Sequence, residues 1–343
     1  MPESAAGRRS RAVIDPVVWS PPPAPPRARL RASTPPAQLS VFPIPGVGGE
    51  DVSVDADGTV LTGVSDGRIL RISADGESIT TVADTSGRPL GLARDPDGRL
   101  IVCDAERGLL RVDLDDGIGP DAVEVLLDHV AGEPIRFCSN AVAAADGTIY
   151  LTESTRRFSL GDYKADLLEH RGTGRLIRLD TDGSVTVLMD DLHFANGVAL
   201  AADESFLLVA QTGAYSVERL WLTGERSGRR EPFVANLPAF PDNLALGTDG
   251  LFWLALPSTR NATLDFLSSK PPVLRKIAWA LPAVLQPREA KTVFVQAFDN
   301  SGTLVHDLQT SHPDFHFCTG VAERDGVLWL GSLLCSTIAR IAL

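Results

Sequence analysis

Short apolar stretches separated by Asp-Gly or Asp-Glu turns recur along the chain from about residue 40 to its end. Six segments share one pattern, in which an apolar run leads into such a turn and then into a second apolar run. Short apolar runs joined by Asp-Gly turns are typical of β-hairpins. The pattern therefore predicts antiparallel strands in a unit that repeats every 40 to 75 residues or so, roughly the spacing of a repeat architecture. The six segments begin at Glu50, Leu90, Asn140, Asn196, Asn243 and Thr319.

Most units continue with a third and a fourth apolar run, as at residues 67–72 and 79–82 in the first unit. Four antiparallel strands in each of six units predict an all-β fold, a six-bladed β-propeller. The last unit ends near Ile341 with too few strands. We expect the segment that begins at Leu39 to supply the missing strand and to close the ring from the N-terminal side.

Two kinds of segment depart from the repeat. Residues 1–38 are rich in proline and predict an arm, either disordered or wrapped on the propeller of residues 39–343. Insertions at about 157–171 and 260–291 predict a short helix and a longer amphipathic helix that starts at Val273. Such insertions often build substrate walls. We do not expect the second insertion to contact a membrane, because it is short and ends at Pro282.

Composition excludes some classes of protein. The net charge of −12 argues against nucleic-acid binding, which needs clustered Lys and Arg. The four cysteines show no CxxC pair, so we expect thiols in a reducing compartment, with a Cys138–Cys318 disulfide as the alternative. No apolar run is long enough to span a membrane, and no hydrophobic run of a secretion signal follows the first arginines. We therefore expect a cytoplasmic protein.

Oxygen-bearing side chains stand at matching places in the repeat, just before the first strand of four blades. In a propeller these places converge on one opening of the central channel. Two carboxylates with two or three amides suit one Ca²⁺ ion, and the absence of His and Cys argues against zinc. Asn and Asp before a strand are also common turn formers, which is the alternative. The predicted metal ligands are Glu50, Asn140, Asn196, Asp242 and Asn243.

These segments, together with Gly49-Glu-Asp-Val, Phe194-Ala-Asn-Gly-Val-Ala-Leu and Leu330-Gly-Ser-Leu, resemble a known superfamily. It contains the calcium-dependent propellers called gluconolactonases, senescence marker protein and paraoxonases. The likeness is greatest to its strictosidine-synthase-like branch, which includes the adipocyte plasma membrane-associated proteins. The resemblance implies a six-bladed propeller with catalytic calcium on the five ligands named above. Because Ala141 stands where a second, structural calcium needs a carboxylate, it implies one central ion.

Two positions depart from relatives within the superfamily. The catalytic glutamate of strictosidine synthase itself matches Thr319 in this chain, so we do not expect an alkaloid condensation. The histidine base of paraoxonases matches Leu90, so a histidine dyad is not expected either.

The resemblance makes Asp242 the first candidate for the base or nucleophile, with Asp104 and His316 as further candidates. A carboxylate can accept a proton from water or attack an ester carbonyl. An apolar pocket is predicted, to which the helix around Trp279 would contribute; it favours a hydrophobic substrate. The predicted pocket residues are Leu90, His193, Phe194, Phe317 and Thr319.

Together these features predict a calcium-dependent hydrolase that acts on a small lactone or carboxylic ester. Two alternatives remain open at this stage. One is a propeller that holds calcium as a structural plug and binds a ligand or partner without turnover. The other is a biosynthetic enzyme of the strictosidine-synthase-like type. Oligomeric state is not predicted.

Overall fold

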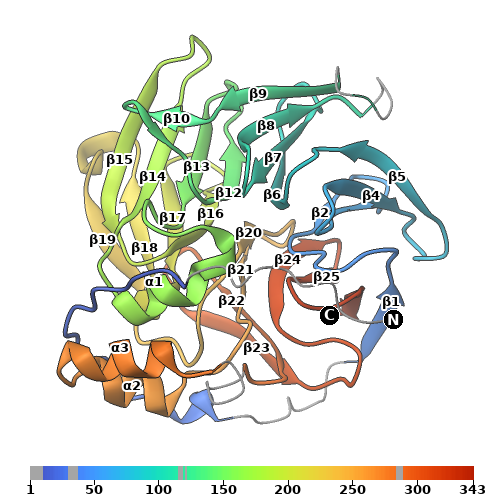
Figure 1. The fold of residues 1–343 in the computed structure, drawn as a ribbon. Helices are drawn as coiled ribbons and strands as arrows, with labels where there is room; N and C mark the ends of the chain where they lie inside the picture. Colours follow the sequence, from blue (N-terminus) through green and yellow to red (C-terminus); the bar gives the residue numbers. More distant parts are fainter. Residues whose placement is uncertain (1–10, 30–37, 115–118, 120–121, 283–288) are drawn as a thin grey trace.

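The computed structural model describes residues 11–29, 38–114, 119, 122–282 and 289–343. Six four-stranded antiparallel sheets are arranged as blades around a common axis, as the repeat pattern predicts (Figure 1). Blade 1 consists of β2 (Ser53–Val54), β3 (Val60–Gly63), β4 (Arg68–Ile72) and β5 (Ile79–Asp84). Blade 2 consists of β6 (Pro89–Arg94), β7 (Leu100–Asp104), β8 (Gly108–Val112) and β9 (Val123–Leu127). Blade 3 consists of β12 (Cys138–Ala143), β13 (Ile149–Glu153), β14 (Gly174–Leu179) and β15 (Val185–Leu192).

The remaining blades follow in chain order, and a small hairpin of β10 (His129–Val130) and β11 (Glu133–Pro134) lies between blades 2 and 3 in the sequence. Blade 4 consists of β16 (Ala195–Leu200), β17 (Phe206–Gln211), β18 (Ser216–Trp221) and β19 (Arg230–Val234). Blade 5 consists of β20 (Leu244–Leu246), β21 (Phe252–Ala255), β22 (Val293–Phe298) and β23 (Leu304–Thr310). Blade 6 consists of β24 (Cys318–Arg324), β25 (Val327–Ser332), β26 (Thr337–Ala342) and β1 (Leu39–Pro43).

Blade 6 combines the last three strands of the chain with β1, the strand that precedes blade 1 in the sequence. Strand β1 pairs antiparallel with β26, in a register that sets Leu39 opposite Ile341 and Pro43 opposite Thr337. Leu39 and Val41 also pack against the apolar cluster between blades 5 and 6. The predicted closing strand is thus confirmed, and the ring is held shut by backbone hydrogen bonds and apolar contacts rather than by a covalent link.

The core is divided among the interfaces between neighbouring blades. In β7, Leu100 and Val102 pack toward blade 1, whereas Ile101 and Cys103 pack toward blade 3. Successive side chains of a strand point to opposite faces, and both faces of each blade are covered by a neighbour. This explains why the second strands of the blades are continuous apolar runs instead of alternating ones.

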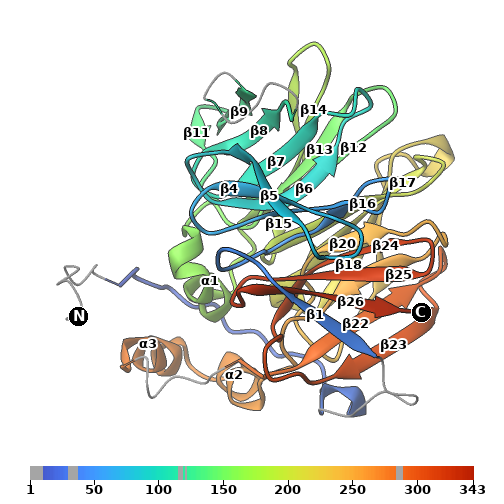
Figure 2. The same ribbon diagram turned by 90° about the vertical axis from the view of Figure 1, so that its right-hand side faces the viewer.

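Short helices lie on one side of the blades (Figure 2). The first insertion forms η3 (Leu160–Asp162) and α1 (Tyr163–Glu169), as predicted. The second forms two helices, α2 (Ala262–Ser268) and α3 (Pro272–Ala280), where one was predicted. The remaining short turns of helix are η1 (Pro26–Ala28), η4 (Thr212–Ala214) and η5 (Gly224–Arg226).

The sequence explains why the second insertion divides. Asn261 caps α2, because its side chain accepts hydrogen bonds from the backbone N–H groups of Thr263 and Leu264. Pro271 cannot continue a helix from α2, and Pro272 stands at the first position of α3, where its missing N–H costs nothing.

The described part of the proline-rich arm, residues 11–29, lies against these helices. Val17 donates its backbone N–H to Glu169 O over 2.9 Å, and Trp19 donates its own to Ser268 O over 2.9 Å. Of the two alternatives for the arm, wrapping therefore holds for these residues; residues 1–10 and 30–37 lie outside the described part.

The four cysteines are buried and free, so the alternative of a Cys138–Cys318 disulfide is not realised. Among the described residues, no helix has the length and apolar character needed to cross a membrane.

Candidate functional site

The innermost strands of four blades are irregular where the sequence pattern places candidate chemistry. Their pairing with the second strand shifts register at Leu90 in β6, Asn140 in β12, Asn196 in β16 and Thr319 in β24. A bulge of this kind redirects a side chain that regular pairing would place against a neighbouring blade. Asn140 and Asn196 therefore lie inside bulged strands, not just before the strands as predicted.

Glycine follows three of these residues, Leu90, Asn196 and Thr319, and permits neighbouring blades to approach closely near the axis. A Cβ atom on Gly197 would lie 2.3 Å from the backbone nitrogen of Leu244, and one on Gly320 would lie 2.6 Å from the Cα atom of Asp51. Neither distance is tolerated by a side chain, so glycine is required for the blades to meet here.

The predicted ligands meet through a chain of hydrogen bonds across the axis. Asn243 donates its Nδ2 to Glu50 Oε1 over 3.1 Å, and Asn140 donates its Nδ2 to Asn243 Oδ1 over 3.2 Å. Asn140 Nδ2 also lies 3.3 Å from Oδ2 of Asp51, the neighbour of Glu50. On the far side, Asn196 donates its Nδ2 to Thr212 Oγ1 over 3.1 Å, and the backbone N–H of Gly197 donates to Asp242 O over 3.2 Å. Blades 1, 3, 4 and 5 thus place all five predicted ligands at one site.

Three carboxyl groups are buried at this site with little positive charge to balance them. Glu50, Asp51 and Asp242 are 6%, 5% and 8% exposed. Burial raises the pKa of Asp51 to about 7. Burial and the neighbouring Asp242 carboxyl raise the pKa of Glu50 well above its usual range, and burial does the same for the pKa of Asp242. Desolvation disfavours the charged form of each acid.

Arg88 opposes this effect on Glu50, and its guanidinium donates to the backbone oxygens of Pro89 and Gly48, each over 2.9 Å. Glu50 Oε2 is buried, and it has no hydrogen-bond partner among the described residues. Within the described ranges, no group of three or more His, Cys, Asp or Glu side chains is arranged to hold a metal ion. A cation bound here would therefore depend on the asparagine oxygens as well as on Glu50 and Asp242. Such a mixed oxygen set, with an unsatisfied buried carboxylate oxygen, fits a hard cation.

A cavity of about 640 Å³ opens above this site, and Glu50, Asn196 and Asp242 form part of its floor. Its walls are mostly apolar. They include four of the five predicted pocket residues, Leu90, Phe194, Phe317 and Thr319, together with Phe137, Leu160, Leu167, Phe240, Leu264, Leu267 and Leu333.

Phe194 and Phe317 occupy equivalent places, immediately before β16 and β24. Both have positive backbone φ angles, 58° and 56°. This conformation is uncommon for a bulky residue and indicates local strain. In both blades it precedes the bulge that carries Asn196 or Thr319, and both aromatic rings line the cavity.

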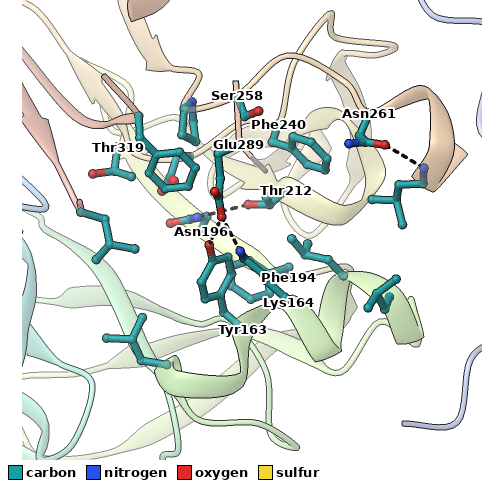
Figure 3. A pocket seen from close by; sticks show the side chains of 18 of the residues that line it. Tyr163, Lys164, Phe194, Asn196, Thr212, Phe240, Ser258, Asn261, Glu289 and Thr319 are labelled. Carbon is teal, nitrogen blue, oxygen red and sulfur yellow. Dashed lines mark hydrogen bonds and ion pairs between the residues drawn. The ribbon is translucent and has the colours of Figure 1, made fainter. Parts of the chain in front are cut away.

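The cavity wall also contains a polar cluster that the sequence did not predict, formed by Tyr163, Lys164 and Glu289. Lys164 on α1 forms an ion pair with Glu289, and Tyr163 Oη donates to Glu289 Oε1 over 3.4 Å. Figure 3 shows Glu289 pointing across the cavity toward these two side chains. Burial and the charge of Glu289 raise the pKa of Tyr163. Burial also acts to raise the pKa of Glu289, but the hydrogen bond and charge of Lys164, a backbone hydrogen bond and the hydrogen bond from Tyr163 together outweigh it, and the net shift is downward.

Asp104, predicted as a catalytic candidate, does not line the cavity. It ends β7 and is fully buried. Its Oδ1 accepts backbone hydrogen bonds from Arg88 and Glu106 over 2.9 Å, and from Arg107 over 3.0 Å. These bonds hold the turn after β7, which is a structural role.

Neither His193, predicted as a pocket residue, nor His316, predicted as a catalytic candidate, lines the cavity. The ring of His193 stacks on His170, with centroids 4.2 Å apart, and His170 stacks in turn on Trp19 of the N-terminal arm. Nδ1 of His316 lies 3.6 Å from Sγ of Cys335. Trp279, expected in the pocket wall, instead packs with Ile14 and Phe158 away from the cavity.

Comparison with known proteins supports the likeness on which these predictions rest. A family model described as strictosidine synthase matches residues 140–225, and one described as the N-terminal part of strictosidine synthase-like proteins matches residues 37–72. Strictosidine synthase-like protein 6 of Arabidopsis thaliana is 34% identical over 86% of this chain and 78% of its own length. The adipocyte plasma membrane-associated protein of Rattus norvegicus is 33% identical over 86% and 83%.

Solved structures agree in fold. A gluconolactonase from Xanthomonas campestris superimposes with a TM-score of 0.65 at 19% identity, over 98% of this chain and 99% of its own. Regucalcin from Agrobacterium tumefaciens, described as a calcium-binding protein, gives 0.58 at 14% identity over 88% and 92%. Identities this low show the fold alone. The identities to the two curated relatives, over most of each chain, show more: the chain belongs to the strictosidine synthase-like family of six-bladed β-propellers.

Proposed function

We propose that this protein is a calcium-dependent hydrolase that acts on a lactone or carboxylic ester with an apolar body. The observation that carries the proposal is the floor of the cavity. Glu50 and Asp242 are buried there with Asp51 beside them, and in the described part of the chain Glu50 Oε2 has no hydrogen-bond partner. A divalent cation would relieve the repulsion among these groups and satisfy that oxygen.

Calcium suits this floor better than other common ions. Glu50, Asn140, Asn196, Asp242 and Asn243 offer only oxygen as a ligand atom, and Ca²⁺ accepts carboxylate and amide oxygens in flexible geometry. Asparagine amides can present either their oxygen or their nitrogen, so the side chains that now donate to carboxylates could turn their oxygens inward. When bound, the ion would polarise a substrate carbonyl at the floor.

The residues of the chain have separate tasks in this reaction. Asp242 faces the cavity and would take a proton from the attacking water or attack the carbonyl itself. Asn196 donates to Thr212 Oγ1, and Thr212 donates in turn to the backbone oxygen of Pro241, so these bonds hold the segment that carries Asp242. Phe194 and Phe317 line the space above and would hold the apolar part of the substrate, keeping bulk water away.

Other members of the fold class add support at the level of analogy. Among the similar solved structures are a gluconolactonase and a protein described as calcium-binding. A condensation of the strictosidine synthase kind is less well supported, because the glutamate that it needs is Thr319 here. The Thr319 hydroxyl donates to the backbone oxygen of Glu50 over 2.7 Å and so serves to hold the floor in place.

The deciding experiment combines metal analysis and activity on one preparation. Metal content is measured by mass spectrometry, and hydrolysis is measured on aryl esters and on γ- and δ-lactones, with chelator and after calcium is restored. The proposal predicts bound calcium and an activity that disappears with the chelator and returns with the ion. Bound calcium without turnover would favour a ligand-binding propeller with a structural ion. Hydrolysis that persists without metal would contradict the mechanism.

A further inference from the structure

Large apolar side chains are exposed together on α2, α3 and the described part of the N-terminal arm. On the helices, Phe266, Val273 and Ile277 are 60%, 55% and 56% exposed. On the arm, Val13 and Val18 are 85% and 54% exposed. Single exposed apolar residues are ordinary, but a group on adjoining elements indicates a surface for contact. We call this group of elements, residues 11–29 with α2 and α3, the apolar face.

The arm and the helices form one surface because specific bonds join them. Trp279 on α3 donates its Nε1 to Ala12 O over 2.8 Å, and Lys276 Nζ lies 3.2 Å from Asp15 Oδ1. Trp19 adds its backbone bond to Ser268 at the end of α2. Figures 1 and 2 show the arm running beside the helices before it reaches β23, where Arg27 forms an ion pair with Asp307.

The charge of this face is opposite to that of the rest of the protein. Residues 11–29 and 260–282 carry a net charge of +5, whereas the whole chain carries −12. Of their seven basic side chains, Arg260 and Arg275 are buried, and the other five are at least partly exposed. Lys270 holds its ammonium 4.7 Å from the ring centroid of Phe266, beside the most exposed aromatic residue of the face. Apolar side chains together with basic ones are the pattern that binds the interface of an anionic bilayer.

The same helices connect the face to the cavity. Leu264, Leu267 and Ala278 line the cavity from α2 and α3. Leu281, just beyond α3, both lines the cavity and is 37% exposed. An apolar molecule held among lipid chains at this face would be next to the cavity wall without first crossing water.

We propose that the apolar face docks the protein on the surface of an anionic phospholipid bilayer, with α2 and α3 lying in the interface. The sequence led to the opposite expectation, because α3 alone is short. The tertiary structure adds α2 and the arm to it, which enlarges the apolar area and adds positive charge. The proposal concerns binding and does not depend on the hydrolase activity.

Flotation of the full-length protein with lipid vesicles tests this proposal. The vesicles contain phosphatidylcholine alone or phosphatidylcholine with phosphatidylserine, each at low and at raised salt. We expect binding to the phosphatidylserine vesicles that weakens as salt screens the basic side chains. The double variant Phe266→Ser/Ile277→Ser removes two exposed apolar side chains whose burial among lipid chains would favour docking, so its binding should fall about tenfold or more.

A matched control alters exposed apolar residues elsewhere. Leu304→Ser/Val305→Ser changes side chains that are 44% and 50% exposed on β23, outside the face, and should bind vesicles like the unaltered protein. Thermal melts of both double variants check that the fold is intact.

Three results would overturn the proposal: no binding of the unaltered protein to phosphatidylserine vesicles, equal binding to neutral vesicles, or equal binding by the Phe266/Ile277 variant. Light scattering supplies a further test. A dimer that this variant converts to a monomer would assign the face to a second copy of the chain instead.

Discussion

Asn243 in blade 5 donates its side-chain amide to Oε1 of Glu50 in blade 1, over 3.1 Å across the propeller axis. Both residues are buried, and the bond joins blades at different points of the ring. Through Asn243, Glu50 on the cavity floor is linked to Asn140 of blade 3.

Replacing Asn243 with leucine tests that floor. Asn243→Leu has a similar volume but removes both the proposed calcium ligand and the donor to Glu50. We expect calcium affinity, measured by isothermal titration calorimetry, to fall about tenfold or more, which corresponds to at least ~1.4 kcal/mol. Asn300→Leu, at an exposed turn between β22 and β23, is the control and should leave the affinity unchanged. Equal affinities in the two variants would remove Asn243 from the proposed ligand set.

Asp242 is expected to carry the chemistry. Asp242→Asn keeps an oxygen ligand but removes the base, so kcat on a responsive ester or lactone should fall about 100-fold or more. The control is Asp249→Asn, which changes a carboxyl of the same blade that does not line the cavity. Asp249 accepts a 3.1 Å hydrogen bond from the indole N–H of Trp253, and the variant should retain activity. An Asp242→Asn variant with bound calcium and full activity would show that the base lies elsewhere.

Asp104 is expected to affect stability and not turnover. Asp104→Ala leaves three backbone N–H groups without their acceptor, which should lower the free energy of unfolding by about 2–4 kcal/mol. Denaturant unfolding measures this loss, and assays below the transition measure activity. A variant that is as stable as the original but inactive would return Asp104 to the catalytic site.

The stacked histidines predict a dependence of stability on pH. Burial lowers the pKa of His170 from 6.5 to about 3, with His193 acting in the same direction. As the pH falls below 6.5, the unfolded chain binds a proton that folded His170 does not accept until about pH 3. The free energy of unfolding should therefore decrease across this window, by up to about 1.4 kcal/mol per pH unit from this group.

His170→Phe provides the comparison, because phenylalanine keeps the stack on Trp19 but cannot bind a proton. Denaturant unfolding at about pH 7 and about pH 5 should show a smaller loss of stability on acidification in this variant than in the original protein. Identical losses would mean that His170 is not kept neutral by its surroundings.

The sequence predicted the blades well for a physical reason. Each blade places apolar residues and turn residues at the same spacing, and such local patterns are visible without knowledge of contacts. The closing strand β1 was predictable because the last unit has too few strands and an apolar run begins at Leu39.

The cavity wall was less predictable. Lys164 and Glu289 are 125 positions apart and belong to different insertions, so no local pattern relates them. Helix α2 carries a usable sequence signal, the capping residue Asn261, which apolar periodicity alone does not detect. Asp104 shows the opposite limitation: a carboxylate that holds a turn and one that faces a substrate look alike in a sequence.

By itself, the sequence determined the number of blades, the closure of the ring and the set of oxygen-bearing side chains that meet near the axis, because all of these follow from a repeated local pattern of apolar, turn and polar residues. Only the tertiary structure decided which carboxyls are buried together, which aromatic rings line the cavity and how the arm joins α2 and α3. Those properties depend on distances between residues remote in the chain, and burial, charge repulsion and exposed apolar area arise only when such residues are brought together.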